Sequence, residues 1–271
     1  MKKLLFIFIV LSCVSIAKAQ YVGCNEIPVN KYSILDSAQL KFTYNFSYKK
    51  SYFKNESDTA FVVDKQSLLI GKKVSKYYSQ YYLDYCERVK NKTFDIEEGM
   101  CSFEIFKNYP VNKVTATEQA GKIFGGSYIY HENMNEFIWK ISNDTISILG
   151  YTCQKATTTF RGRNYTAWFA PEIPSNNGPW KFGGLPGLIL KISDDKRNFI
   201  FECIGIQKLK KQESIKLYTL NYKKVTRQEL DKLYRRFVNN PKQFWITTGI
   251  EVGEALMMEL PKLNYNPIEL E

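Results

Sequence analysis

Histidine is almost missing from this 271-residue chain, in which His131 is the one example. A Ser-His-Asp or Cys-His hydrolytic set would therefore have a single base available, beside Glu132 near the end of a predicted strand. The sequence also contains no P-loop, no GxGxxG after a strand, no HExxH and no GxSxG. These absences exclude Walker-type and dinucleotide chemistry. They predict no catalytic residue and no cofactor, and they favour a role other than catalysis.

Cysteine spacings suited to a metal are absent as well. There is no CxxC and no paired Cys/His spacing, so no metal site is expected. Beyond residue 19 the chain holds five cysteines: Cys24, Cys86, Cys101, Cys153 and Cys203. An oxidising compartment would allow Cys86 to pair with Cys101, while the odd number leaves at least one thiol unpaired or intermolecular.

After its first 19 residues the chain has no apolar run long enough to cross a bilayer, so no transmembrane span is expected. Residues 1–19 have a positive start, an apolar run and the small-residue pattern Ala17-Lys18-Ala19, which together predict a signal peptide. The protein is therefore expected to be exported, to the periplasm or cell envelope. The pattern ending at Cys13 resembles a lipoprotein signal, but it would shorten the apolar core to about nine residues and is the disfavoured reading.

Acidic residues are outnumbered, with 27 Asp and Glu against 38 Lys and Arg. The excess is concentrated between Gln207 and Gln243, where eleven basic residues accompany three acidic ones. Such a segment could face anionic lipid, an anionic peptide or an acidic partner. The alternative is the solvated face of a helix. No nucleic-acid partner is expected.

Aromatic residues make up 15% of the chain and favour strands. Between Leu40 and Phe46 apolar and polar residues alternate, as in a half-buried strand. We predict a mainly β protein, an antiparallel curved sheet or half-barrel with one packed amphipathic helix near the C-terminus. Residues 20–259 would form a single domain, with a long loop or insertion at 90–112 and a loosely held tail at 260–271.

The patterns near the middle of the chain predict hairpins. Strands are expected at 137–141 and 151–160, with a turn at 142–144, and Arg161-Gly162-Arg163 is expected to form a loop of two or three residues. A four-residue loop at 194–197 would pair Ile192 with Phe199 and place Cys203 on the buried face.

The stretch GPWKFGGLPGLILKI, residues 178–192, combines four glycines and two prolines with an apolar run. Pro186 and Gly187 have the composition of a type II turn that leads into a strand. Further on, Thr226 and Glu229 form a capping box before apolar residues at helical spacing, and Asn239-Asn240-Pro241 is expected to end that helix.

Several short motifs in order resemble the GLPGLI family of exported proteins from Bacteroidetes, mainly across residues 129–206. They include Gly150-Tyr151-Thr152-Cys153, Arg161-Gly162-Arg163, Ala167-Trp168-Phe169 and Gly184-Leu185-Pro186-Gly187-Leu188-Ile189. The resemblance implies an exported envelope protein working beside an outer-membrane transport system, and it implies no catalytic residue.

Aromatic and cationic residues gather in the same block of sequence and could line a groove for a peptide carboxylate, a sugar or an anionic head group. The alternative is that the tryptophans are core residues and the arginines stabilise their own hairpin. The predicted ligand-binding residues are Trp139, Tyr151, Arg161, Arg163, Trp168, Trp180 and Lys181.

These observations favour a non-enzymatic periplasmic binding or accessory protein, with an outer-membrane transport or envelope protein as a partner. One alternative is an envelope hydrolase, peptidase-like, that uses His131 with a carboxylate or thiol. A second alternative is a partner-docking module that uses the basic helix 227–239.

Overall fold

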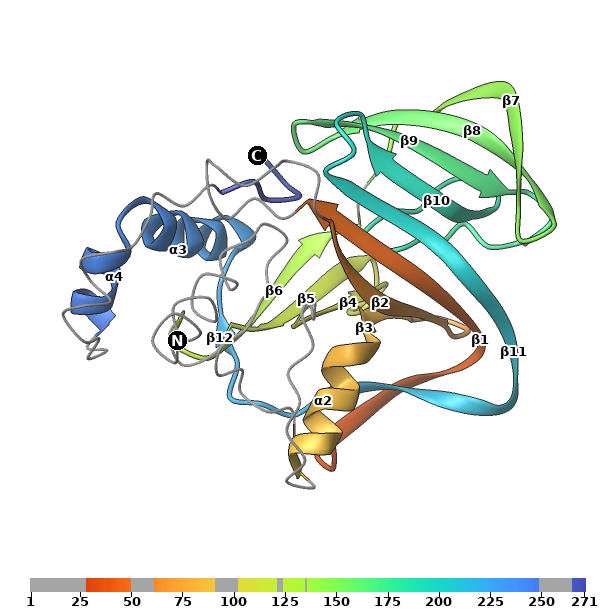
Figure 1. Cartoon of the computed structure of the whole chain (residues 1–271). Helices are drawn as coiled ribbons and strands as arrows, with labels where there is room; N and C mark the ends of the chain where they lie inside the picture. Colours follow the sequence, from red (N-terminus) through yellow and green to blue (C-terminus); the bar gives the residue numbers. More distant parts are fainter. Residues whose placement is uncertain (1–27, 50–60, 91–101, 121–123, 135, 249–264) are drawn as a thin grey trace, which may run out of the picture.

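Twelve strands of this chain form one sheet, in the order β12-β6-β5-β4-β3-β2-β1-β11-β10-β9-β8-β7. The computed structural model describes residues 28–49, 61–90, 102–120, 124–134, 136–248 and 265–271 (Figure 1). Every strand pair is antiparallel except β12 with β6. The predicted mainly β fold with a curved antiparallel sheet is confirmed.

The strands are β1 (Tyr32–Lys49), β2 (Phe61–Ile70), β3 (Ser75–Ser79), β4 (Phe103–Lys107), β5 (Lys113–Gln119), β6 (Ser127–Asn133), β7 (Lys140–Ile148), β8 (Tyr151–Phe160), β9 (Arg163–Ala170), β10 (Leu188–Asp194), β11 (Phe199–Tyr218) and β12 (Lys223–Lys224). The helices of the described residues are α2 (Gln80–Lys90), α3 (Arg227–Asn239) and α4 (Pro241–Thr248). None of them is long and apolar enough to cross a membrane.

The two longest strands, β1 and β11, pair along most of their length and form the centre of the sheet. Alternation in β1 buries Phe42, Tyr44 and Phe46 completely, which is the face expected from the sequence. Register shifts interrupt the pairing at three places, and such irregularities increase twist and bend a strand. The sheet therefore curves about this pair (Figure 1).

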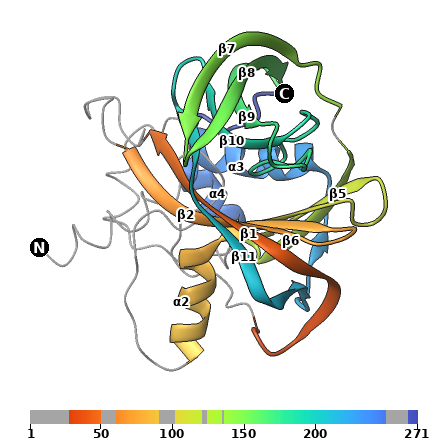
Figure 2. The ribbon, with the colours of Figure 1, turned by 90° about the vertical axis from the view of Figure 1, so that its right-hand side faces the viewer.

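The main core lies between the two halves of this curved sheet. Strands β7 to β10 curl over one end of β1 and β11, and β2 to β6 extend on the other side (Figure 2). Side chains from both halves belong to one buried cluster, for example Phe46, Tyr77, Phe182 and Phe201, whose rings contact one another. Trp180 and Phe182 of the loop before β10 also belong to this core.

The hairpins correct several predictions. Strand β7 begins at Lys140 rather than residue 137, and it runs through the turn expected at 142–144 as an irregular stretch. The turn is formed instead by Leu149 and Gly150, both with positive φ, because a two-residue hairpin loop requires that conformation. Arg161 and Gly162 form the second two-residue loop, also with positive φ.

The hairpin of β10 and β11 has the predicted buried face but different partners. Ile192 pairs with Phe201 rather than Phe199, because the loop consists of residues 195–198. A shift of two residues keeps every side chain on the same face, since side chains in a strand alternate with period 2. Ile192, Phe201 and Cys203 are accordingly buried.

Three other expectations are wrong. The segment 90–112 contains strand β4 and the last residue of α2, so it is not one long loop. Gly187 has a φ of 159° and therefore does not form the predicted type II turn. Glycine is required at this position for another reason: a Cβ would lie 2.3 Å from the carbonyl oxygen of Ala170. Residues 265–271 of the tail are held tightly, as described below.

Helix α3 begins as predicted, with the reciprocal capping box of Thr226 and Glu229, and buries Leu230, Tyr234 and Phe237. It also ends as predicted, at Asn239 with Asn240 as its C-cap, and Pro241 then starts a second helix, α4, because proline is well tolerated in the first turn.

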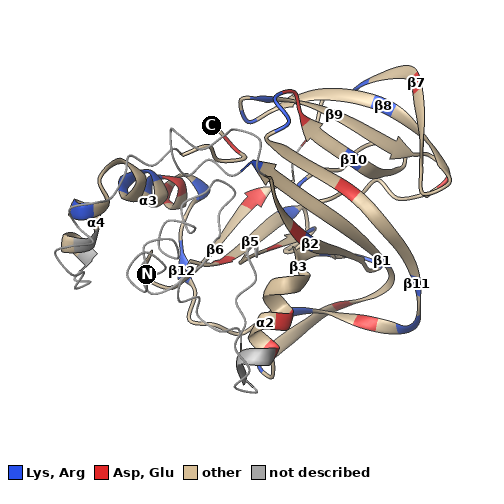
Figure 3. Cartoon of the chain, in the orientation of Figure 1, with Lys and Arg blue, Asp and Glu red and all other residues tan. Residues whose placement is uncertain are grey.

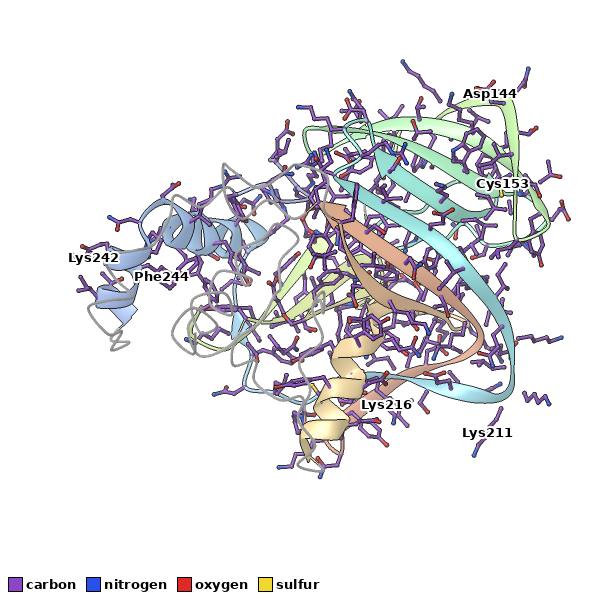
Figure 4. The ribbon with its side chains drawn as sticks, viewed as in Figure 1. Asp144, Cys153, Lys211, Lys216, Lys242 and Phe244 are labelled. Carbon is purple, nitrogen blue, oxygen red and sulfur yellow. The ribbon has the colours of Figure 1, made fainter. Side chains whose placement is uncertain are left out.

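The basic residues after Gln207 do not form one stripe but are spread over β11, β12, α3 and α4 (Figure 3). Lys211 lies at the outer bend of β11 and Lys216 nearer the end of that strand, and both are far from Lys242 on α4 (Figure 4).

The cysteines of the described residues are all buried: Cys86, Cys153 and Cys203. Burial raises the pKa of Cys153 to about 11 and that of Cys203 to about 12, so neither thiol is a nucleophile at neutral pH. The predicted signal peptide, Cys24 and Cys101, the proposed partner of Cys86, lie outside the described residues.

Candidate functional site

A groove of about 410 Å³ opens where four segments of the chain meet. Its walls are the β2–β3 turn (residues 70–75), the end of β4 (Lys107 and Asn108), Met134 with Phe137, and residues 175–177 with 181–184 of the loop before β10. We call this the lysine groove, because Lys72, Lys73, Lys107 and Lys181 all line it and no acidic residue is among its lining residues.

Lys107 is a buried cation of the lysine groove that is held by backbone carbonyl groups. It is 5% exposed, and its ammonium donates to the carbonyl oxygens of Gly178 at 2.7 Å and Phe182 at 2.8 Å. Both acceptors are neutral, so they replace part of the lost hydration but supply no opposite charge. Burial lowers the pKa of Lys107 to about 7.

Hydrogen bonds hold the groove walls in place. The Asn108 amide donates to the carbonyl oxygen of Lys73, and the Asn177 amide donates to the Ser75 hydroxyl, both at 2.9 Å. The Trp139 indole donates to the carbonyl oxygen of Gly183 at 2.9 Å. Each bond joins segments that are far apart in the sequence, so the lining groups are positioned before any ligand arrives.

Behind the β2–β3 turn, Asp36 accepts from the backbone N–H groups of Lys73 and Val74. Burial works against the charged form, but these donors and that of Ser37 hold the pKa of Asp36 below its usual value. The carboxylate is therefore occupied in shaping the turn, and it is not among the lining residues of the lysine groove.

The cations predicted to bind a ligand instead hold the segment 265–271, which we call the docked segment. The Lys181 ammonium contacts Glu132 at 2.5 Å and both carboxylate oxygens of Glu269 at 2.9 and 3.0 Å. The Arg161 guanidinium contacts Glu132 at 2.9 Å. Arg227 of α3 lies 3.3 Å from Glu132 and 4.0 Å from Glu269.

Arg163 binds the backbone of the docked segment. It donates to the carbonyl oxygens of Pro267 at 2.6 Å and Ile268 at 3.2 Å and pairs with Asp194 at 3.2 Å. Burial raises the pKa of Asp194, while the Phe199 N–H and Arg163 act in the opposite direction. Ile268 is 3% exposed and belongs to the main core, so the docked segment is part of the folded structure.

The structure therefore separates the seven predicted ligand-binding residues. Arg161, Arg163 and Lys181 converge on the docked segment and Trp180 is buried beside them. Trp139 donates a hydrogen bond to the carbonyl oxygen of Gly183 in the wall of the lysine groove. Tyr151 and Trp168 lie on β8 and β9, where Trp168 is covered by the Lys155 ammonium.

Lys107, the central residue of the groove, was not predicted. From the sequence alone, a lysine in a strand is expected to face solvent. Only the residues that surround Lys107 in the folded structure show that its side chain is buried.

His131 lies on β6 outside the lysine groove. Its Nδ1 is 2.7 Å from the Thr115 hydroxyl. Burial, followed by the charges of Lys224 and Lys113, lowers its pKa. Among the described residues, no thiol and no carboxylate forms a hydrogen bond with the His131 ring, as a hydrolytic pair would require.

Comparison with protein families matches residues 109–236, just under half of the chain, to the family described as "N-glycanase peptide, N-terminal domain". No curated protein matches the chain. Two solved structures of PNGF-II, in space groups P21 and C2, are each 16% identical, with TM-scores of 0.48 and 0.47. The alignments cover 74% and 73% of this chain, which spans about a third of the length of those structures: 33% and 32%.

The family match corrects two interpretations of the sequence. The resemblance to the GLPGLI family is wrong, because the family that matches, over the same region, is the N-glycanase one. A non-enzymatic binding or accessory protein is contradicted as well, because that family is named for an enzyme. Of the sequence-based alternatives, a hydrolase is the closer one.

Proposed function

We propose that this chain is the glycan-recognising domain of an exported N-glycanase-type hydrolase, and that the lysine groove holds the glycan of a glycosylated asparagine. The family match carries the proposal, because residues 134–184 of the groove lie inside the matched segment 109–236. Export, to the periplasm or cell envelope, rests on the signal peptide predicted at residues 1–19.

The chemistry of the lysine groove supports this assignment. A saccharide offers hydroxyl groups that need hydrogen-bonding partners and a ring face that packs on apolar surface. The groove offers the polar side chains of Ser175 and Asn176 and the apolar surface of Phe137. Its volume of about 410 Å³ lies in the range of about 300–1,000 Å³ that is typical of ligand sites.

Two residues of the predicted ligand-binding set enter this proposal. Trp139 fixes the carbonyl oxygen of Gly183 in the groove wall. Lys181 lines the groove, although its ammonium is paired with Glu132 and Glu269. A peptidase-like mechanism based on His131 is not proposed, because the contacts of its ring are to Thr115 and to basic neighbours.

The test uses one peptide with and without an N-linked biantennary glycan. Calorimetry is expected to detect binding of the glycosylated form alone, and hydrogen exchange is expected to slow in residues 70–75, 107–108 and 175–184. Mass spectrometry of the same sample measures glycan release. Equal binding of the two peptides, or protection confined to other segments, would refute the proposal.

A further inference from the structure

Within the proposed glycan site, and resting on that proposed function, we propose that the lysine groove selects a negatively charged sugar unit, carrying a carboxylate or a sulfate ester, with Lys107 as its buried charge partner. The first observation is the sign of the charge. Four lysines line the groove, and no aspartate or glutamate is among its lining residues.

Lys107 differs from the other three lysines. The charge of Lys181 is matched by Glu132 and Glu269 outside the groove, and Lys72 and Lys73 are exposed to water. The ammonium of Lys107 is buried, and it donates to two neutral carbonyl oxygens. An ammonium has three N–H donors, so one remains for a ligand.

A buried cation whose partners are neutral has an unfavourable solvation energy. An anion that enters the groove would offset this cost and would receive a charge-assisted hydrogen bond, which is stronger than a neutral one. A neutral sugar would receive only an ordinary hydrogen bond. The preference for an anion therefore follows from the burial of Lys107.

The exposed lysines at the rim complete the site. Lys72 and Lys73 belong to the β2–β3 turn, on the wall formed by residues 70–75. The backbone of Lys73 is fixed from both sides, because its N–H donates to Asp36 and its carbonyl oxygen accepts from Asn108. Two exposed cations on a fixed turn attract an anion to the groove.

Isothermal titration calorimetry on the full chain tests this, with one biantennary N-glycopeptide in three forms: neutral, sialylated and sulfated. We expect at least one anionic form to bind about 10- to 100-fold more tightly than the neutral form, the range for one charged hydrogen bond. Lys107→Met should remove the preference, so that the anionic and neutral forms bind with about the same affinity.

Two further variants keep the test decisive if Lys107→Met folds poorly. Lys72→Glu reverses an exposed charge at the rim and should weaken anionic binding about tenfold or more. Lys196→Met removes an exposed charge outside the groove, in the loop after β10, and should leave every affinity unchanged.

Each outcome separates this inference from the proposed function. Tight binding of the sialylated form alone, or of the sulfated form alone, supports the inference and identifies the acid group. Equal affinity for neutral and anionic forms overturns the inference and leaves the proposed function standing. Absence of binding to all three forms overturns both. An anionic preference that survives in folded Lys107→Met and in Lys72→Glu overturns the assignment to the lysine groove.

Discussion

The buried ammonium of Lys107 makes the stability of the protein depend on pH in a way that one substitution can isolate. Its pKa is about 7 in the fold, against 10.5, the ordinary value for lysine, in the unfolded chain. Between these two values the unfolded chain binds more protons than the folded one. Stability therefore rises as pH increases through this window.

The expected size follows from the two pKa values. One pKa unit corresponds to about 1.4 kcal/mol, and proton linkage from pH 7 to pH 9 then amounts to about 2 kcal/mol. Lys107→Met removes the titrating group. We expect the free energy of unfolding of the wild type, relative to that of Lys107→Met, to increase by about 2 kcal/mol between pH 7 and pH 9.

Urea unfolding followed by tryptophan fluorescence at pH 7, 8 and 9 measures this difference. Lys73 and Lys181 also line the groove but are present in both proteins, so the difference between the two proteins isolates Lys107. Lys72→Met is the matched control, because Lys72 is exposed and its charge is solvated in both states. A difference between wild type and Lys107→Met that stays constant over the pH range would refute the desolvation of Lys107.

Four further substitutions test the docked segment, two glycine positions and the cap of α3. Glu269→Ala leaves Lys181 buried with one carboxylate fewer and should cost about 3–5 kcal/mol, measured as a lower urea midpoint; a loss below about 1 kcal/mol would mean that the docked segment does not stabilise the fold. Gly187→Ala should cost about 3 kcal/mol or more because its Cβ meets backbone, whereas Gly150→Ala, with nothing within 4 Å, should cost about 1 kcal/mol for its positive φ alone. Thr226→Ala should lower stability by about 1 kcal/mol through loss of the helix cap, and an unchanged thermal midpoint would contradict that role.

Much of the fold was predictable because its signals are local. Alternation over Leu40–Phe46 depends on neighbouring residues alone, and it identified the buried face of β1. The capping box of Thr226 and Glu229 spans three residues and identified the start of α3. The register of strand pairing was predicted less well than the buried faces. The β10–β11 pairing differs by two residues from the prediction. The reason is that periodicity in the sequence determines which face of a strand is buried, whereas the geometry of the loop determines which residues pair.

The candidate site was predicted poorly because its contacts are long-range. Lys107 meets the carbonyl oxygen of Gly178 across 71 residues, and Lys181 meets Glu269 across 88. A cluster of arginines and a lysine in the sequence suggested a ligand site, but the fold satisfies those charges with its own carboxylates. Short motifs likewise suggested the wrong family, whereas the match over residues 109–236 draws on the whole segment.

By itself, the sequence determined the strand character of this protein, the buried face of its central strands and the start of α3, since each follows from steric and hydrogen-bonding preferences within a few residues. Tertiary structure alone decided which charges are available to a ligand. Lys181 is neutralised by Glu132 and Glu269, while Lys107 is buried against two carbonyl oxygens. The physical reason is that the desolvation of a charged side chain and its pairing with an opposite charge depend on the groups that surround it in space. The sequence of one strand does not show which distant residues will cover that strand in the fold.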